Sequence, residues 1–331
     1  TDASVVVGPA IAAFDWSRDN YDALAGAVAA GHVIECGTQA TGGNFSGFRS
    51  IDFTRPLGFP IAEIAVDGSS VITKHEGTGG AVTADTVTAQ LVYEIQDERY
   101  LNPDVVVDLT SIELTQQATD RVAITGVKGT PPPSTTKVGI NRFGGFRNVV
   151  EFVLTGLDID EKAALVRAQM EAGLAANPPA VVEWDLQRTD QPDAATQATS
   201  AALYRCSVKS PTPDAVGRSF TNAAIEIALA SYAGFHVTAP PKAGAPFGVF
   251  TAGYVPQSSV PHRVNHADGT VDEVEAPQVT SDIRAAGPLF MPPSYEPSDA
   301  PCVQAPLGRI AHARSGDKGG NANIGVWIGA D

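Results

Sequence analysis

Apolar side chains recur with a helical period near the start of the chain. They fall on one side of a helix predicted for residues 20–33, which Asp19 or Asn20 can cap, and Gly37 ends the pattern. The apolar positions on that side are Leu24, Ala27, Val28 and Ile34. The pattern therefore predicts an amphipathic helix that ends at a glycine-rich loop.

A second helix is predicted for residues 83–95. Thr83 suits its N-cap, and Asp85 lies where the helix dipole favours negative charge. Short strands are predicted between and after the two helices, at residues 61–66, 71–73, 105–109 and 122–127.

The second part of the chain has a clearer rhythm of strands and helices. Strands are predicted at residues 148–154, 182–186, 203–208 and 247–250. One helix begins at Asp158 or Asp160, and another covers residues 219–232 with Ile225 and Leu229 facing inward. The order β-α-β-β-α-β is that of a ferredoxin-like split βαβ unit.

These elements predict an α/β, mixed α+β fold in four segments. Residues 1–145 form an α/β section with glycine-rich loops, and residues 146–255 form the ferredoxin-like βαββαβ section. Residues 256–306 are rich in proline and acidic residues, as in a linker or surface-crossing arm. Residues 307–331 are predicted to begin a small C-terminal domain.

Both ends of the chain look incomplete. The chain lacks an initiator Met, and the strand predicted at residues 324–328 cannot form a sheet alone. We therefore expect a gene product that extends beyond both ends, and an unusually short homologue is the alternative.

Composition narrows the class of partner. With 22 basic and 37 acidic residues, the net charge is −15, which disfavours nucleic acid and anionic membranes as general partners. A local basic pocket could still bind a phosphorylated ligand. No apolar run spans a bilayer and no secretory signal opens the chain. Cys36, Cys206 and Cys302 form no CxxC pair, which favours three reduced thiols in a cytoplasmic protein.

Three glycine-rich loops are the main candidates for ligand binding. None matches a Walker A loop or a GxGxxG motif. The second loop precedes a helix N-terminus, where free amides and the dipole favour an anion, and Lys74 lies beside it. A tight turn before a capped helix is the alternative. The ligand-binding residues predicted in the first two loops are Gly42, Gly43, Asn44, Lys74, Gly77, Thr78, Gly79 and Gly80.

Glu35 precedes the first loop and is a candidate acid/base residue, although a surface carboxylate is the alternative. His32 and Cys36 have the i, i+4 spacing of a Cys–His pair. A helix C-terminus raises the pKa of a thiol, so Cys36 is better explained as a small buried residue.

The third loop contains Asp317 and Lys318 between glycines. A lysine beside glycine backbone can bind a carboxylate or phosphate, and the aspartate can orient it or move protons. The alternative is an ion pair that fastens a turn. His312 and Arg314 alternate with alanines, so both are predicted on one face of an extended segment. Further ligand-binding residues predicted here are Arg314, Ser315, Asn321 and Asn323.

Other sequence patterns give weaker indications of a functional site. His262 and His266 lie in a segment whose Pro, Asn, Asp and Gly residues disfavour a helix, and they have no third ligand nearby, so no metal site is expected. Residues 141–147 could bind a nucleotide-like group or form a turn. No GxSxG motif supports a hydrolase triad.

Four motifs resemble the AtuA-type acyclic terpene utilisation family. They are IECGTQATGGNF at residues 34–45, LGFPIAE at 57–63, ITKHEGTGG at 72–80 and HARSGDKGGNANI at 312–324. The resemblance covers the whole chain. It implies a further α/β section before Thr1 and a small ferredoxin-like domain after Asp331.

The resemblance implies that the protein processes acyl-CoA thioesters in the catabolism of citronellol- and geraniol-like compounds. A hydratase or carbon–carbon lyase acting on a branched 3-hydroxyglutaryl- or glutaconyl-type CoA would need acid/base groups and a stabilised oxyanion. Glu35 or Asp317 would move protons, and Lys318 with glycine amides would hold the oxyanion. A non-catalytic acyl-CoA-binding or carboxylase-associated subunit is the alternative. No cofactor is expected, and the protein is expected to form a homo-oligomer.

Overall fold

The computed structural model describes residues 3–95, 97–282, 303–318 and 321–328, and it leaves the side chains of residues 317, 318 and 321 undescribed. The chain forms two compact units, which are described separately below. Unit 1 comprises Thr1–Thr136 with Tyr254–Asp331, and unit 2 comprises Lys137–Gly253. Helices and antiparallel sheets occur together, which confirms the predicted mixed α+β class. The division into four segments stays a prediction.

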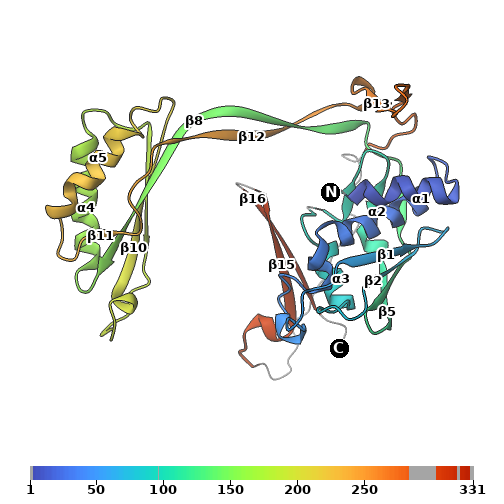
Figure 1. The fold of residues 1–331 in the computed structure, drawn as a ribbon, viewed down its shortest axis with the longest axis horizontal. Helices are drawn as coiled ribbons and strands as arrows, with labels where there is room; N and C mark the ends of the chain where they lie inside the picture. The colour runs from blue at the N-terminus through green and yellow to red at the C-terminus, as the bar shows by residue number, and fades with distance from the viewer. Residues whose placement is uncertain (1–2, 96, 283–302, 319–320, 329–331) are drawn as a thin grey trace. The chain divides into compact units, whose positions relative to one another are not determined.

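Unit 1 begins with helices and continues as short strands around a further helix (Figure 1). Its helical elements are η1 (Ala3–Val6), α1 (Val7–Phe14), α2 (Tyr21–Glu35), η2 (Gly37–Thr41), η3 (Phe48–Ser50), α3 (Ala84–Leu91) and η4 (Leu109–Ser111). Its strands in this part are β1 (Pro60–Ile64), β2 (Ser70–Lys74), β3 (Arg99–Leu101), β4 (Val106–Asp108), β5 (Glu113–Ala118), β6 (Arg121–Thr125) and β7 (Lys128–Thr130). They form antiparallel sheets in the orders β1-β2-β6-β5 and β3-β4-β7.

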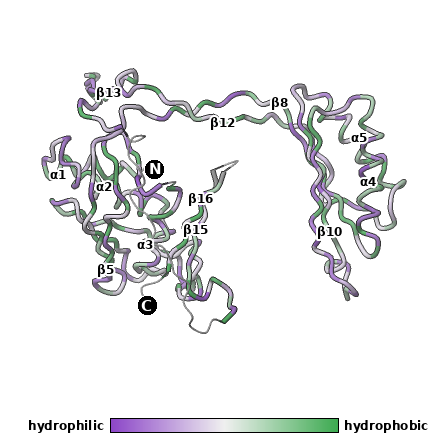
Figure 2. The backbone as a smooth tube through the Cα atoms, turned by 180° about the vertical axis from the view of Figure 1, so that it is seen from behind, coloured by the Kyte–Doolittle hydropathy of each residue, from purple (hydrophilic) through white to green (hydrophobic). Residues whose placement is uncertain are grey.

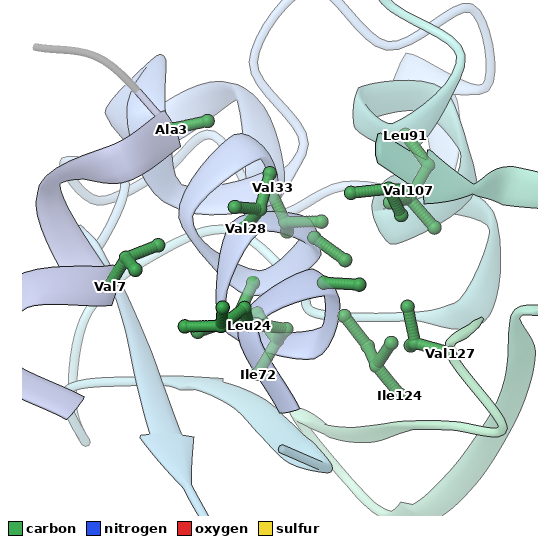
Figure 3. Packing of buried hydrophobic residues seen from close by; sticks show 14 of the residues in the cluster. Ala3, Val7, Leu24, Val28, Val33, Ile72, Leu91, Val107, Ile124 and Val127 are labelled. Carbon is green, nitrogen blue, oxygen red and sulfur yellow. The ribbon is translucent and has the colours of Figure 1, made fainter. Parts of the chain in front are cut away.

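Helix α2 is the centre of the unit 1 core. Every residue from Ala23 to Val33 is buried, so the helix has no solvent face. Figure 3 shows Ala3 and Val7 against one side of α2 and Val107 and Ile124 toward the other. The helix was predicted with one apolar side. It is instead covered all round, because its alanines and glycines let neighbouring segments approach closely.

Backbone contacts on glycine explain this packing. A Cβ on Gly26 would lie 2.1 Å from the carbonyl oxygen of Gly68, in the turn between β1 and β2. A Cβ on Gly31 would lie 1.8 Å from the carbonyl oxygen of Ala3. A real Cβ cannot approach an oxygen so closely, so only glycine lets these segments reach α2.

Helix α3 begins as predicted and ends sooner. The Thr83 hydroxyl accepts a hydrogen bond from the Thr86 amide, and the Thr86 hydroxyl accepts one from the Thr83 amide, forming a capping box. This confirms Thr83 as the N-cap. The helix stops at Leu91 rather than at residue 95, and Glu94 takes a left-handed φ of 62°. A residue with that backbone conformation cannot continue a right-handed α-helix.

The last part of unit 1 contains two hairpins and two short 3₁₀ turns. The hairpin strands are β13 (His262–Asn265), β14 (Val271–Val274), β15 (Ala311–Lys318) and β16 (Asn321–Ile328), and the turns are η7 (Gln257–Ser259) and η9 (Leu307–Arg309). The strand predicted at residues 324–328 is confirmed as part of β16, but it is not alone, and most of the polar loop predicted before it belongs to β15, which pairs with β16. Gly316 and Gly325 fit within these strands because their backbones lie against the Tyr93 and Val92 side chains.

Unit 2 has the predicted β-α-β-β-α-β order. Its elements are β8 (Thr135–Thr155), α4 (Ile159–Leu174), β9 (Val181–Gln187), η5 (Ala198–Ser200), β10 (Ala201–Ser210), α5 (Arg218–Glu226), η6 (Ile227–Leu229), β11 (His236–Val237) and β12 (Ala245–Pro256). The antiparallel sheet has the order β11-β8-β10-β9. Helices α4 and α5 lie on one face of this sheet (Figure 1), and no helix of unit 2 covers the opposite face.

Two predictions for unit 2 are corrected. Strand β8 begins at Thr135 rather than at residue 148, because it also pairs with β12, where Gly144 lies against Phe247. Hydrophobic and hydrophilic residues are interspersed along this pair of strands (Figure 2). Ile225 and Leu229 are 52% and 102% exposed rather than inward-facing. A second set of apolar residues in the same segment is buried instead, and its members are Phe220, Ala223, Ala224 and Ile227.

The close approach at α2 can be tested with a matched pair of glycine substitutions. Gly26→Ala should lower the free energy of unfolding by about 1–3 kcal/mol, because the new methyl group overlaps the Gly68 carbonyl. The measurement is urea and thermal unfolding followed by circular dichroism. Gly8→Ala in α1 is the control, since nothing lies within 4 Å of its added Cβ and alanine favours a helix. Equal midpoints for wild type and Gly26→Ala would disprove the packing argument.

Candidate functional site

The β15–β16 hairpin is fastened to unit 1 by aromatic stacking. The rings of Phe45, His312 and Trp327 form a three-ring cluster, in which the His312 centroid lies 5.1 Å from that of Phe45 and 5.5 Å from that of Trp327, and the Phe45 and Trp327 centroids are 6.4 Å apart. The Trp327 indole donates a hydrogen bond of 3.1 Å to the Asp85 carboxylate at the start of α3. The Ser46 hydroxyl lies 3.1 Å from His312 Nδ1. These contacts place the inner face of the hairpin over η2 and α3.

Arg314 is the buried cation on that inner face. Its side chain is 8% exposed, and its guanidinium carbon lies 4.1 Å from the centre of the Tyr93 ring. The guanidinium donates hydrogen bonds to the Gln39 side-chain oxygen and, at 3.4 Å, to the Asn44 carbonyl. This confirms the prediction that His312 and Arg314 point to one face, and it supplies hydrogen bonds to a buried charge.

A group of polar side chains, most of them titratable, lies around Arg314. We call Cys36, Gln39, Tyr93, Glu94 and Arg314 the Arg314 cluster. Burial raises the pKa of the Cys36 thiol, the Glu35 carboxylate raises it further, and Arg314 has a smaller opposing effect. Burial likewise raises the pKa of Tyr93, and its hydrogen bond with Glu94 adds to the effect. Both groups therefore carry their protons at neutral pH.

The position of Glu94 is set by the second strand of the hairpin. The Asn323 side-chain oxygen accepts a hydrogen bond of 2.9 Å from the Glu94 amide, and its Nδ2 donates to the Ile95 carbonyl at 2.6 Å. A Cβ on Gly316 would lie 2.8 Å from Glu94 Cγ. The hairpin thus holds Glu94 in its left-handed conformation and brings its carboxylate beside Tyr93.

Gln90 adds a second buried polar group. Its side chain is 1% exposed, and its Nε2 makes no hydrogen bond within the described part of the chain. The amide lies close enough to Cys36 to lower the thiol pKa slightly. Gln90 is therefore a buried polar neighbour of the Cys36 thiol.

Glu35 borders the Arg314 cluster from the end of α2. Its side chain is 26% exposed, and its carboxylate lies 3.7 Å from Nδ1 of the buried His32. The argument against a Cys–His nucleophile pair is supported, because burial and the Glu35 carboxylate raise the pKa of Cys36, although the residue is only half-buried. Glu35 therefore lies beside His32 and the Cys36 thiol, and its acid/base role stays a prediction.

The glycine loops use their amides to close the fold. The Gly43 amide donates to the Thr38 carbonyl at 2.9 Å, the Gly79 amide to Pro56 at 2.9 Å and the Gly80 amide to Asp52 at 2.8 Å. The Gly42 amide donates to Gln39 at 3.2 Å. The α3 N-terminus is capped by its own threonines. These amides are occupied, so ligand binding by the loop backbones stays a prediction.

Lys74, Gly77 and Thr78 lie elsewhere, in the lining of a cavity of about 580 Å³ beside β1 and β2. The Lys74 ammonium is 6% exposed and lies 3.2 Å from the Asp120 carboxylate. It also donates to the Thr78 carbonyl at 3.0 Å. The structure therefore places these three predicted residues apart from the surroundings of Arg314.

Some predicted residues fall outside both places. Ser315 is exposed on the outer face of the hairpin, opposite to that of Arg314. The side chains of Asp317, Lys318 and Asn321 lie outside the described residues, although their backbones belong to β15 and β16.

Sequence reasoning missed Gln39, Gln90, Tyr93 and Glu94. The last three lie in the segment predicted as one helix, so the pattern gave no sign of chemistry there. Gln39 lies within the glycine-rich motif at residues 34–45, and that position was the signal that could have identified it.

Metal-ligand clusters and membrane-spanning helices are both absent from the described residues. Among the described residues, no three His, Cys, Asp or Glu side chains are grouped as metal ligands. No helix in that part of the chain is both long and apolar enough to cross a membrane.

Comparison with known proteins gave one match. A family model described as "Acyclic terpene utilisation family protein AtuA" matches residues 1–266. No curated protein and no solved structure matched the chain.

The protonation of Cys36 can be measured by alkylation. In a Cys302→Ser variant, the Cys36 peptide should react with iodoacetamide only at alkaline pH, because the thiolate is the nucleophile and the pKa is raised. Cys206 should stay unmodified, since burial raises its pKa to about 12. Peptide mass spectrometry against pH gives the midpoint for Cys36.

The neighbours of Cys36 should move this midpoint in opposite directions. Glu35→Gln should lower it by removing a negative charge, and Arg314→Gln should raise it by removing a positive one. Glu161→Gln in α4 of unit 2 should leave it unchanged. A midpoint below that of an ordinary thiol would contradict the geometry of the cluster.

Proposed function

The chain belongs to the acyclic terpene utilisation family AtuA, and we propose that it processes an acyl-CoA thioester in that pathway. Membership of the family gives the protein a role in acyclic terpene utilisation. The substrate class is a branched 3-hydroxyglutaryl- or glutaconyl-type CoA thioester. The reaction is a hydration of the carbon–carbon double bond or a carbon–carbon bond cleavage.

The observation that supports this proposal is the Arg314 cluster. Hydration and carbon–carbon cleavage next to a thioester both pass through an enolate-like oxyanion. A cation that is 8% exposed stabilises such a charge far better than one in water, because the surroundings have a low dielectric constant. The same place holds two groups that keep their protons at neutral pH, as general acids must.

Each residue would have a defined role in the hydration. Glu35 would take a proton from water as its oxygen bonds to the β-carbon, and the electron pair of the double bond would move to the thioester oxygen. Arg314 would hold that oxyanion, and Tyr93 would return a proton to the α-carbon. Asp317 and Lys318 follow Arg314 on β15 and keep their predicted roles in proton transfer and oxyanion binding.

A second candidate function is a non-catalytic acyl-CoA-binding or carboxylase-associated subunit. The occupied glycine amides favour it, because the four loop amides described above donate to protein carbonyls. An oxyanion hole built from backbone amides needs donors that are free to meet the developing charge. In this function the Arg314 cluster would fasten the hairpin, and a thioester would bind unchanged.

Mass spectrometry separates the two functions. Purified protein would be incubated with a panel of branched acyl-CoA thioesters, and the product masses and bound fraction would be recorded. A change of 18 mass units, about one water, indicates hydration, whereas binding without a new mass supports the non-catalytic subunit.

Conservative variants then test the roles. Tyr93→Phe and Glu35→Gln should each lower kcat by about 10²–10⁴ with little change in thermal stability. Glu161→Gln is the surface-carboxylate control. If Glu35→Gln combined with Lys318→Met leaves every turnover unchanged, the catalytic mechanism is wrong.

A further inference from the structure

The open face of the unit 2 sheet carries a trough that no other observation accounts for. Its volume is about 660 Å³, within the range of small-ligand sites. It runs over β8 and β10 and is bounded by the segment of residues 238–245. The Thr238 amide donates to the Glu151 carbonyl at 3.0 Å, which fixes the start of that segment beside β8.

The wall of the trough is held by Asn148. Its side-chain amide donates to the Lys242 carbonyl at 2.7 Å and to the Val216 carbonyl at 2.8 Å. A Cβ on Gly244 would lie 2.9 Å from Val216 Cγ2, so the segment packs closely against the unit 2 core. The wall is therefore a built feature of the fold, and it keeps Lys242 near Arg147, the neighbour of Asn148.

The charges in the trough are unusual for this chain. Its lining holds four basic and two acidic side chains in a protein of net charge −15. Arg205 pairs with Glu151 at 2.8 Å, and Lys209 pairs with Glu183 at 3.4 Å. No carboxylate among the described residues lies within 4.0 Å of the charged groups of Arg147 or Lys242. Two positive charges therefore remain without an ion-pair partner.

The cross-strand register shows that these charges are concentrated at one end. Arg205 faces Glu151 directly across β10 and β8, which is a favourable pair. Arg147 faces Lys209 in the same register, and like charges directly opposite each other destabilise a sheet. An anion between them would remove this repulsion, as it would for the nearby Lys242.

We propose that the trough binds a small organic phosphate ester. Its phosphate lies between Arg147, Lys209 and Lys242, and its apolar part lies along Val149 and Pro240. A phosphate ester carries close to two negative charges at neutral pH, which matches the two unpaired cations. The phosphorylated end of coenzyme A and a free nucleotide share this chemistry. The proposal does not depend on the reaction proposed above.

Isothermal titration calorimetry on the full chain tests the proposal. The probes are coenzyme A, ADP, adenosine 3′,5′-bisphosphate and adenosine, at low and high salt. The phosphate esters should bind at least about tenfold more tightly than adenosine, and rising salt should weaken their binding. Tighter binding of coenzyme A than of ADP identifies the thioester carrier as the source. Binding of ADP as tight as that of coenzyme A, or tighter, identifies a free nucleotide.

Variants locate the site. Arg147→Gln with Lys242→Gln should weaken binding of the phosphate esters by about tenfold or more. Lys137→Gln with Arg218→Gln removes the same charges outside the trough lining and should have no effect. Val149→Glu, at a residue that is 48% exposed, should abolish binding by placing a carboxylate in the trough. Absence of saturable binding by all phosphate esters, or affinities unchanged in the Arg147→Gln, Lys242→Gln protein, overturns the proposal.

Discussion

Unit 1 depends on one helix that is small enough to be approached from every side. Helix α2 is buried from Ala23 to Val33, and its glycines touch the backbones of Gly68 and Ala3. Close packing makes such a centre rigid, because any added methyl group must displace a main chain. The C-terminal end of α2 is fixed as a result, and Glu35 and Cys36 are placed there together with the start of η2.

The same end of α2 is where the chain brings a buried charge. Removing the water around a guanidinium is expensive unless its donors find acceptors, and Gln39 and Asn44 supply them from the first glycine loop. Tyr93 covers its face. A buried arginine therefore ties β15 to the loop that follows α2. Cys36 and Tyr93 lie beside it, and their own burial raises their pKa values.

Local patterns predicted the elements better than the site. The capping of α3 at Thr83 and the strand–helix order of unit 2 depend on residues close in sequence, and both were confirmed. The full extent of β15 was missed because its Gly316 is explained only by the Tyr93 and Glu94 side chains, which are distant in the sequence. Ile225 and Leu229 were placed inward because two apolar stripes share that helix, and the stripe containing the larger Phe220 side chain is the buried one.

Residues of the candidate site were predicted only where the adjacent sequence gives a sign of their role. Arg314 and Asn323 were identified because they lie in a segment dense in polar residues and glycines. Arg314 contacts the Asn44 carbonyl in the loop after α2, and Asn323 contacts the Glu94 amide just after α3. The glycines themselves were interpreted as ligand-binding backbone, yet the amides of Gly43, Gly79 and Gly80 close turns within the protein. In a chain of net charge −15, the general field repels anions, so recognition of one has to come from local cations that burial or geometry sets apart. Arg314 is set apart by burial, and Arg147 by facing Lys209 across the sheet.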